Sequence, residues 1–140
     1  MRMSFVGGKR NYEPRPHTLR ELAARPIFSF QRDSLPFSDL VRRIRQNELD
    51  DACVHPLSAI RAMIDLTIHG FGVATLPYDA MAAFEALPEL QPLTCDVALA
   101  DLPLYASWRH NHDAPGLEAL VDSAVAFTEE LHQRLQARPR

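Results

Sequence analysis

The stretch from Cys53 to Asp79, CVHPLSAIRAMIDLTIHGFGVATLPYD, decides the fold of this chain. It begins with a short apolar strand and a turn. Apolar side chains then recur every three or four residues between Ile60 and Ile68, which predicts a helix with one buried face. Gly70 and Gly72 stop this helix, and residues 73–76 (Val-Ala-Thr-Leu) predict a second strand. A strand–helix–strand unit of this kind predicts an α/β fold with parallel strands.

The remaining pattern predicts short elements separated by prolines, of which the chain has 11. Thr18 and Glu21 have the three-residue spacing of a capping box, which marks a helix N-terminus. Residues 115–135 carry a long apolar stripe typical of a helix. We expect strands over 3–6, 27–30, 50–55 and 102–108, short apolar segments over 90–93 and 97–99, and helices over 18–23, 36–46, 78–87 and 115–135.

Composition excludes several classes of protein. With 140 residues, 46% apolar and 24% charged, the chain should fold as a soluble globule. Its net charge of −3 argues against nucleic-acid binding by these residues alone, and we expect Arg42, Arg43 and Arg45 to form a solvated basic face. Without a membrane-length apolar run or a signal peptide, it should be cytoplasmic.

The two cysteines, Cys53 and Cys95, lack metal-ligand spacing and have apolar neighbours, which predicts buried free thiols in a reducing compartment. Cys53 and His55 would share one strand face, as a nucleophile–base pair or two metal ligands could. We find no third ligand or orienting carboxylate in the pattern, so a buried cysteine beside a histidine is favoured. His110, His112 and Asp113 offer ligand types in a polar loop, but a zinc site needs three or four assembled ligands. We expect no metal, cofactor or catalytic residue.

Three segments together resemble a known family. Residues 66–77, LTIHGFGVATLP, are similar to the LV-x-x-G-x-G-[IV]-A-x-LP signature of LysR-type transcriptional regulators. TLRELA at 18–23, with PIF at 26–28, resembles an earlier segment of that family. LPLY at 102–105, with PGL at 115–117 and Phe127, resembles its closing strand and last helix. Two positions differ from the family pattern. Thr67 stands where the family usually has an apolar residue, and the loop Asn11–Arg15 lacks the His-Pro pair often found there.

The resemblance implies an effector-binding domain with the type 2 periplasmic-binding-protein-like fold, a mixed, mostly parallel sheet flanked by helices. In that family two α/β lobes close on a small effector, often an anion or carboxylate. The winged helix-turn-helix and the first part of this domain have no counterpart here, so the chain is expected to be an excised piece or a truncated gene product. We expect a truncated domain over 1–135, with 1–77 mostly second lobe, 78–135 returning to the first lobe, and a frayed tail over 136–140.

Two helix N-termini at the carboxyl ends of strands predict the effector site, because their unpaired N–H groups favour anions. The candidate effector-binding residues follow the strands 27–30 and 50–55: Phe30, Gln31, Arg32, His55, Leu57 and Ser58. Arg32 would pair with a carboxylate and the Ser58 hydroxyl would donate. Equally, Ser34 and Ser58 could merely cap helices, with Arg32 solvated.

Three functions are compatible with these observations. The resemblance favours a ligand-sensing regulatory domain without catalysis, which forms a homodimer and reaches DNA only through the parent regulator's helix-turn-helix. The second is a homodimeric interaction module that binds no small molecule. The third is a small α/β enzyme using Cys53 and His55, or the His110–His112 loop.

Overall fold

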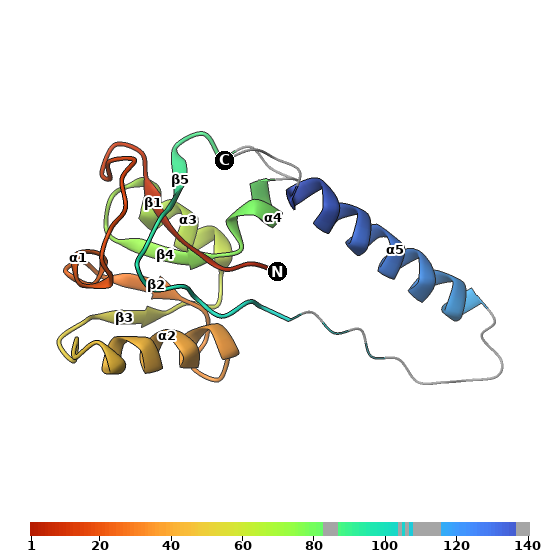
Figure 1. The fold of residues 1–140 in the computed structure, drawn as a ribbon, viewed down its shortest axis with the longest axis horizontal. Helices are drawn as coiled ribbons and strands as arrows, with labels where there is room; N and C mark the ends of the chain where they lie inside the picture. The colour runs from red at the N-terminus through yellow and green to blue at the C-terminus, as the bar shows by residue number, and fades with distance from the viewer. Residues whose placement is uncertain (83–86, 104, 106, 108–115, 137–140) are drawn as a thin grey trace. The chain divides into compact units, whose positions relative to one another are not determined.

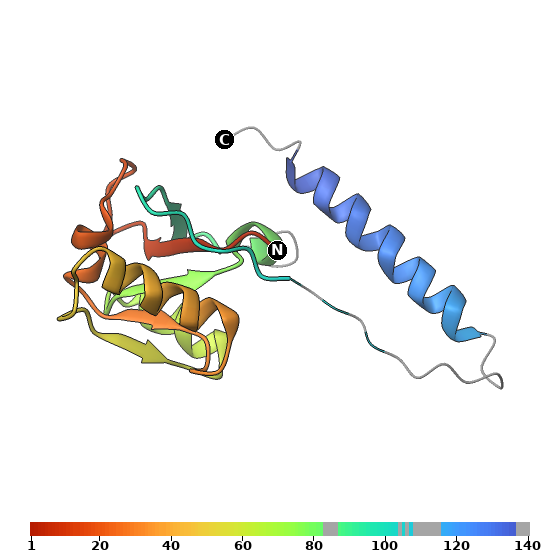
Figure 2. The same ribbon diagram turned by 60° about the horizontal axis from the view of Figure 1, so that its bottom comes forward.

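The computed structural model describes residues 1–82, 87–103, 105, 107 and 116–136. The chain divides into two compact units, Met1–Leu102 and Pro103–Arg140. The first unit contains a five-stranded sheet with helices on both sides (Figures 1 and 2). Within the second unit, the long helix α5 spans Gly116–Gln136.

The sheet is mixed, as the family resemblance implies, with the strand order β3-β2-β4-β1-β5. β2 pairs in parallel with β3 on one side and with β4 on the other, whereas β1 pairs antiparallel with β4 and β5. The predicted strand–helix–strand unit is confirmed as β3, α3 and β4, with β2 between its strands. The strands are β1 (Ser4–Gly8), β2 (Ile27–Ser29), β3 (Val54–Pro56), β4 (Val73–Leu76) and β5 (Leu90–Leu93); the helices of this unit are α1 (Leu19–Ala23), α2 (Leu35–Gln46), α3 (Ile60–Ile68) and α4 (Tyr78–Ala82).

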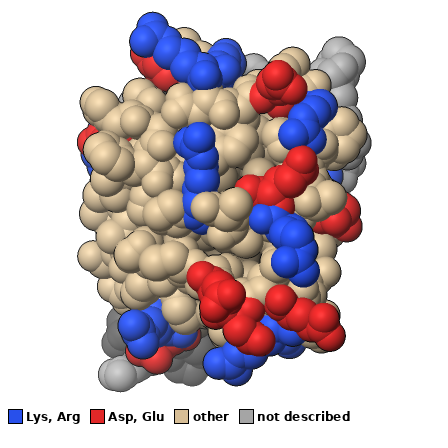
Figure 3. Space-filling model, turned by 90° about the vertical axis from the view of Figure 1, so that its left-hand side faces the viewer, with Lys and Arg blue, Asp and Glu red and all other residues tan. Residues whose placement is uncertain are grey.

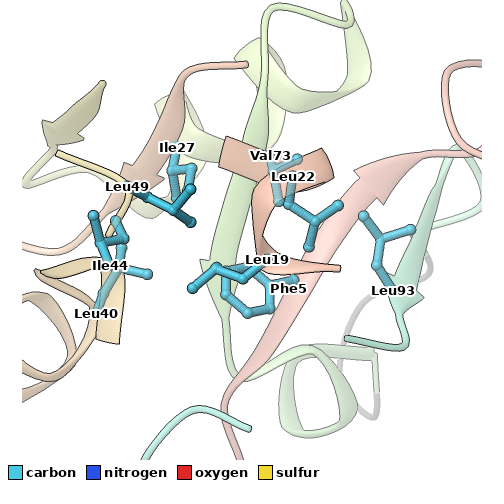
Figure 4. Packing of buried hydrophobic residues seen from close by; sticks show 9 residues of the cluster. All are labelled: Phe5, Leu19, Leu22, Ile27, Leu40, Ile44, Leu49, Val73 and Leu93. Atoms are coloured by element: carbon cyan, nitrogen blue, oxygen red, sulfur yellow. The ribbon is translucent and has the colours of Figure 1, made fainter. Parts of the chain in front are cut away.

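One face of the sheet is covered by α1 and α2. Alternate strand residues point to this face, because successive side chains of a strand point to opposite sides. Their apolar side chains pack against those of the two helices (Figure 4). We call this cluster the first core: Phe5, Leu19, Leu22, Ile27, Leu40, Ile44, Leu49, Val73 and Leu93. The predicted segment 97–99 packs against it through Val97 and Leu99.

The opposite face of the sheet is covered by α3. Met63 and Ile64, which the helical spacing places on the buried face, are 0% and 3% exposed. They pack against the strand residues that alternate with those of the first core. This second core consists of Val6, Phe28, Met63, Ile64, Ala74, Leu76, Leu87 and Leu90.

Local sequence signals set the helix ends. The predicted capping box is confirmed: the Glu21 N–H donates to Thr18 Oγ1 (3.2 Å), and the Thr18 N–H donates to Glu21 Oε2 (2.8 Å). α3 ends in a Schellman motif, with Gly70 N–H bonded to Thr67 O and Phe71 N–H to Leu66 O, both at 3.1 Å. Gly70 has a φ of +77°, which glycine adopts without steric cost.

Gly72 allows the chain to pass close to the backbone just before β2. A Cβ added there would lie 2.1 Å from the Pro26 carbonyl oxygen. The Val73 N–H donates to that same oxygen at 3.0 Å, which brings β4 beside β2. The Gly-x-Gly pattern therefore has two separate functions, a helix stop at Gly70 and a close backbone approach at Gly72.

Several sequence predictions differ from the structure. β3 is Val54–Pro56 rather than 50–55, so Pro56 belongs to the strand. No strand includes the described residues of 102–108 (102, 103, 105 and 107), and Tyr105 is 86% exposed. A strand needs a hydrogen-bonded neighbour, and none of the described strands pairs with this segment.

Two further predictions concern helices. The helix predicted over 78–87 is described as Tyr78–Ala82; residues 83–86 lie outside the described part, and Leu87 is not helical. The loop with His110, His112 and Asp113 also lies outside it. The last helix is confirmed, but Leu120 and Phe127 of its stripe are 65% and 53% exposed.

Candidate functional site

The carboxyl ends of β2 and β3 lie next to each other at one edge of the sheet. Ser29 pairs with Pro56 in the parallel register, and the Leu57 N–H donates to Ser29 O at 2.8 Å. The chain segments that follow, 30–32 and 57–58, therefore leave the sheet side by side. In Figure 1, β3 points toward the end of the sheet where α2 begins. We call these two segments, with His55, the strand-end site.

The structure combines apolar and polar groups at the strand-end site. Phe30 and Leu57 are half-buried and pack against the second core. Gln31, Arg32 and Ser58 are exposed. Small-molecule sites combine apolar side chains with a few polar groups, and both kinds of residue meet at these strand ends.

His55 lies at this edge, and its ring contacts Phe28 of β2 and Cys53. Its ring centroid is 6.1 Å from that of Phe28, and its Nε2 is 3.2 Å from the Sγ of Cys53. The expectation of a buried Cys53 is wrong, because Cys53 and His55 are both exposed. His55 lies on β3, the outermost described strand, and Cys53 directly precedes it, so fewer neighbours cover these side chains than at the centre of the sheet.

The two helix N-termini near this edge differ in their caps. Ser34 caps α2: its Oγ accepts from the Phe37 N–H at 3.4 Å and donates to Gln31 O at 2.6 Å. The N-cap of α3 is Ala59, which has no side-chain hydrogen bond to the first turn. Ser58 thus does not cap α3. The alanine at this N-cap supplies no side-chain oxygen to the first turn of α3, and the N-terminus of a helix attracts anions.

Arg32 lies beside α2 as well as at the strand ends. It lines a hollow of about 420 Å³ together with Phe37, Val41 and Arg45. We did not predict this hollow from the sequence. Phe37, Val41 and Arg45 recur at four-residue spacing, so they share one stripe of α2, and this spacing could have indicated it. Ser38, Arg42 and Gln46 complete its lining.

A metal centre is not assembled in the described part of the chain. No group of three or more His, Cys, Asp or Glu side chains there could hold a metal ion. On the face shown in Figure 3, Lys and Arg alternate with Asp and Glu, so that face carries no continuous basic patch for nucleic acid.

Residues 8–129 match the LysR substrate binding domain family. The chain belongs to this family. The LysR family assignment agrees with the three segments that suggested it, since the match includes all three. Among curated proteins no match was found.

Two solved structures show that this LysR domain has the periplasmic-binding-protein-like fold. One is the Synechocystis PCC6803 CcmR regulatory domain in complex with 2-PG, with 14% identity, a TM-score of 0.59, and coverage of 99% of this chain and 65% of that one. The other is an amino acid ABC transporter substrate-binding protein from Streptococcus pneumoniae Canada MDR_19A bound to L-arginine, with 19% identity, a TM-score of 0.56, and coverage of 96% and 55%. The LysR domain thus spans about two thirds or less of either structure.

The placement of the LysR domain's segments in two lobes stays a prediction.

No helix in the described residues combines the length and apolarity needed to cross a bilayer.

Proposed function

We propose that this chain is the ligand-sensing regulatory part of a LysR-type transcriptional regulator, and that it binds a small anionic or carboxylate effector in the cytoplasm. The observation that carries the proposal is the N-terminus of α3, which lacks a side-chain cap and lies beside the end of β2. Family membership supports the regulatory role, with DNA contacted through a helix-turn-helix of the parent regulator.

Each residue of the strand-end site has a distinct part in this proposal. The first-turn amides of α3 and the Ser58 hydroxyl donate to the anion. Arg32 pairs with a carboxylate, and Gln31 and His55 add hydrogen bonds at the rim. Phe30 and Leu57 pack against the effector's apolar part. The neighbouring structures support a small ligand, since one is described with 2-PG and the other with L-arginine.

A thermal-shift screen of the purified chain tests this proposal. The ligands run from sulfate and phosphate to aliphatic and aromatic carboxylates. A compound that binds only the folded chain stabilises it by about 2.7 kcal/mol at 100 times its Kd. We expect a saturable rise in Tm that Arg32→Ala and Ser58→Ala each reduce.

Two control variants locate the binding site. Arg20→Ala removes an exposed arginine from α1 and should leave the shift unchanged. Arg45→Ala removes an arginine that lines only the α2 hollow. If Arg45→Ala abolishes the shift while Ser58→Ala preserves it, the ligand binds in the hollow and the strand-end assignment is wrong. No shift with any compound would favour the homodimeric interaction module.

We infer also that the chain forms a homodimer. α5 exposes large apolar side chains, with Leu120, Val125 and Phe127 being 65%, 50% and 53% exposed. Apolar surface of this kind favours association with a second chain. Mass measurement by light scattering at micromolar concentration should give about twice the chain mass of 15.8 kDa. A monomeric mass would contradict the homodimer.

A further inference from the structure

The pair Cys53 and His55 is an exposed thiol beside an exposed imidazole. Cys53 Sγ lies 3.2 Å from His55 Nε2, within hydrogen-bond distance for sulfur. Cys53 directly precedes β3 and His55 lies within it, and the short sulfur–nitrogen distance shows that the two side chains lie on the same side of the chain. Neither the regulatory role nor the effector contacts proposed above use the sulfur atom.

Neighbouring residues position the His55 ring and leave the Cys53 sulfur accessible to solvent. The His55 ring lies against the Phe28 ring, 6.1 Å between centroids and tilted by 36°. In the backbone, the Ile27 N–H donates to Cys53 O at 2.9 Å, which fixes the start of β3 against β2. β3 is the outermost described strand on its side of the sheet, so a small molecule can approach the sulfur from solvent.

Cys95 provides the contrast within the same chain. It is half-buried, and its Sγ lies 3.3 Å from a carboxylate oxygen of Asp96 rather than beside an imidazole nitrogen. Burial, with a contribution from the Asp96 carboxylate, raises the pKa of the Cys95 thiol to about 11. A thiol kept protonated in this way is a poor nucleophile, because the thiolate is the reactive form.

We propose that Cys53 is a modification site, a reactive thiol that forms mixed disulfides with small disulfide compounds, with His55 as its base. In this exchange the Cys53 S–H proton passes to His55 Nε2. The Cys53 sulfur then attacks one sulfur of the small disulfide, forming a new S–S bond as the original S–S bond breaks. The departing thiolate takes the proton from the imidazolium and leaves as a free thiol, so no other oxidant is required.

The test uses the full chain with glutathione disulfide as the probe. The rate of mixed-disulfide formation is measured by intact-mass spectrometry at neutral pH in two variants with one cysteine each, Cys95→Ser and Cys53→Ser. We expect the chain that retains Cys53 to react at least about ten-fold faster than the chain that retains Cys95. Equal rates, or a faster Cys95, would overturn the proposal.

A second comparison separates a base from a structural support. In the Cys95→Ser background, His55→Gln keeps a polar side chain but removes the basic nitrogen, and should slow Cys53 by about ten-fold. Adding free imidazole should restore part of that rate, which a loss of structure could not explain. A His55→Gln chain that reacts at the unmodified rate would rule out the role of His55. The assay contains no effector, so its result is independent of the effector-binding proposal.

Discussion

The Asp39 carboxylate on α2 accepts a hydrogen bond from the Ala100 backbone N–H at 2.8 Å, across 61 positions of sequence. This hydrogen bond holds the segment after β5 against α2. Asp39 is only 5% exposed, and it also accepts from Arg42 and from Arg43 Nε, the latter at 2.7 Å. A buried carboxylate is tolerated here because charged and polar donors surround it.

Asp39→Asn should lower the free energy of unfolding by about 1–3 kcal/mol, because it leaves Arg43 with a weaker partner in a half-buried position. Urea denaturation measures this loss. Asp65→Asn is the matched control: its ion pair with Arg61 is exposed and should contribute less than about 1 kcal/mol. Equal losses in the two variants would show that burial of Asp39 is unimportant.

The Asp39 contribution should also depend on pH. Burial alone raises the pKa of Asp39, but the hydrogen bonds from Arg43, the Ala100 N–H and Arg42 together outweigh it and leave the pKa below the ordinary 3.8. The stabilisation is therefore present above pH 3.8 and is lost as the pH falls through the lower folded-state pKa. The stability difference between the unmodified chain and Asp39→Asn should shrink in that acidic range.

Glu21 should make a second contribution to stability that is lost in acid. A hydrogen bond from Arg15, followed by the Thr18 N–H, lowers the pKa of Glu21 from 4.5 to about 2. Because the folded-state pKa is the lower one, the stabilisation exists above pH 4.5 and disappears as the pH falls toward 2. Glu21→Gln retains the capping-box geometry without the charge. Its stability, followed by circular dichroism, should depend less on pH over this range than that of the unmodified chain.

Gly72→Ala should destabilise the fold by about 1–3 kcal/mol or more, since the new Cβ would overlap the Pro26 carbonyl oxygen, a backbone atom that cannot move away alone. Thermal denaturation compares it with Gly116→Ala, where nothing lies within 4 Å of the added Cβ. The control should change stability by less than about 1 kcal/mol. An unchanged Tm for Gly72→Ala would contradict the close approach of the start of β4 to Pro26, directly before β2.

Ser29 and Thr75 should prove energetically coupled. Thr75 Oγ1 donates to Ser29 Oγ at 2.9 Å, and the residues are 1% and 0% exposed. Thr75→Val should cost about 0.5–1.5 kcal/mol, and the double variant with Ser29→Ala should cost less than the sum of the two single changes. A double-mutant cycle in urea measures this coupling, and strict additivity would refute it.

Much of the fold could be predicted because its signals are local. The Thr18–Glu21 capping box, the apolar face of α3 and the glycines after it each depend on neighbours in sequence. The family resemblance of residues 66–77 then indicated the larger architecture, which the family match confirms. The strand predicted over 102–108 failed for the described residues because an apolar run does not supply the neighbouring strand that it needs.

The candidate site was predictable only as two separate segments. That residues 30–32 and 57–58 follow strands can be inferred from the pattern, but their adjacency comes from the parallel β2–β3 register. The exposure of Cys53 was missed for a related reason: an apolar sequence neighbourhood does not reveal whether a strand is central or at an edge. The hollow beside α2 also depends on where the loop with Arg32 lies.

The sequence by itself determined the helix stops, the capping box, the two faces of α3 and the family, since these depend on residues at short spacing. Tertiary structure alone decided that Asp39 meets Ala100, that Cys53 faces solvent beside His55, and that α3 has an uncapped N-terminus at the end of β2. These contacts join elements through sheet order and register, which arise from packing the whole chain.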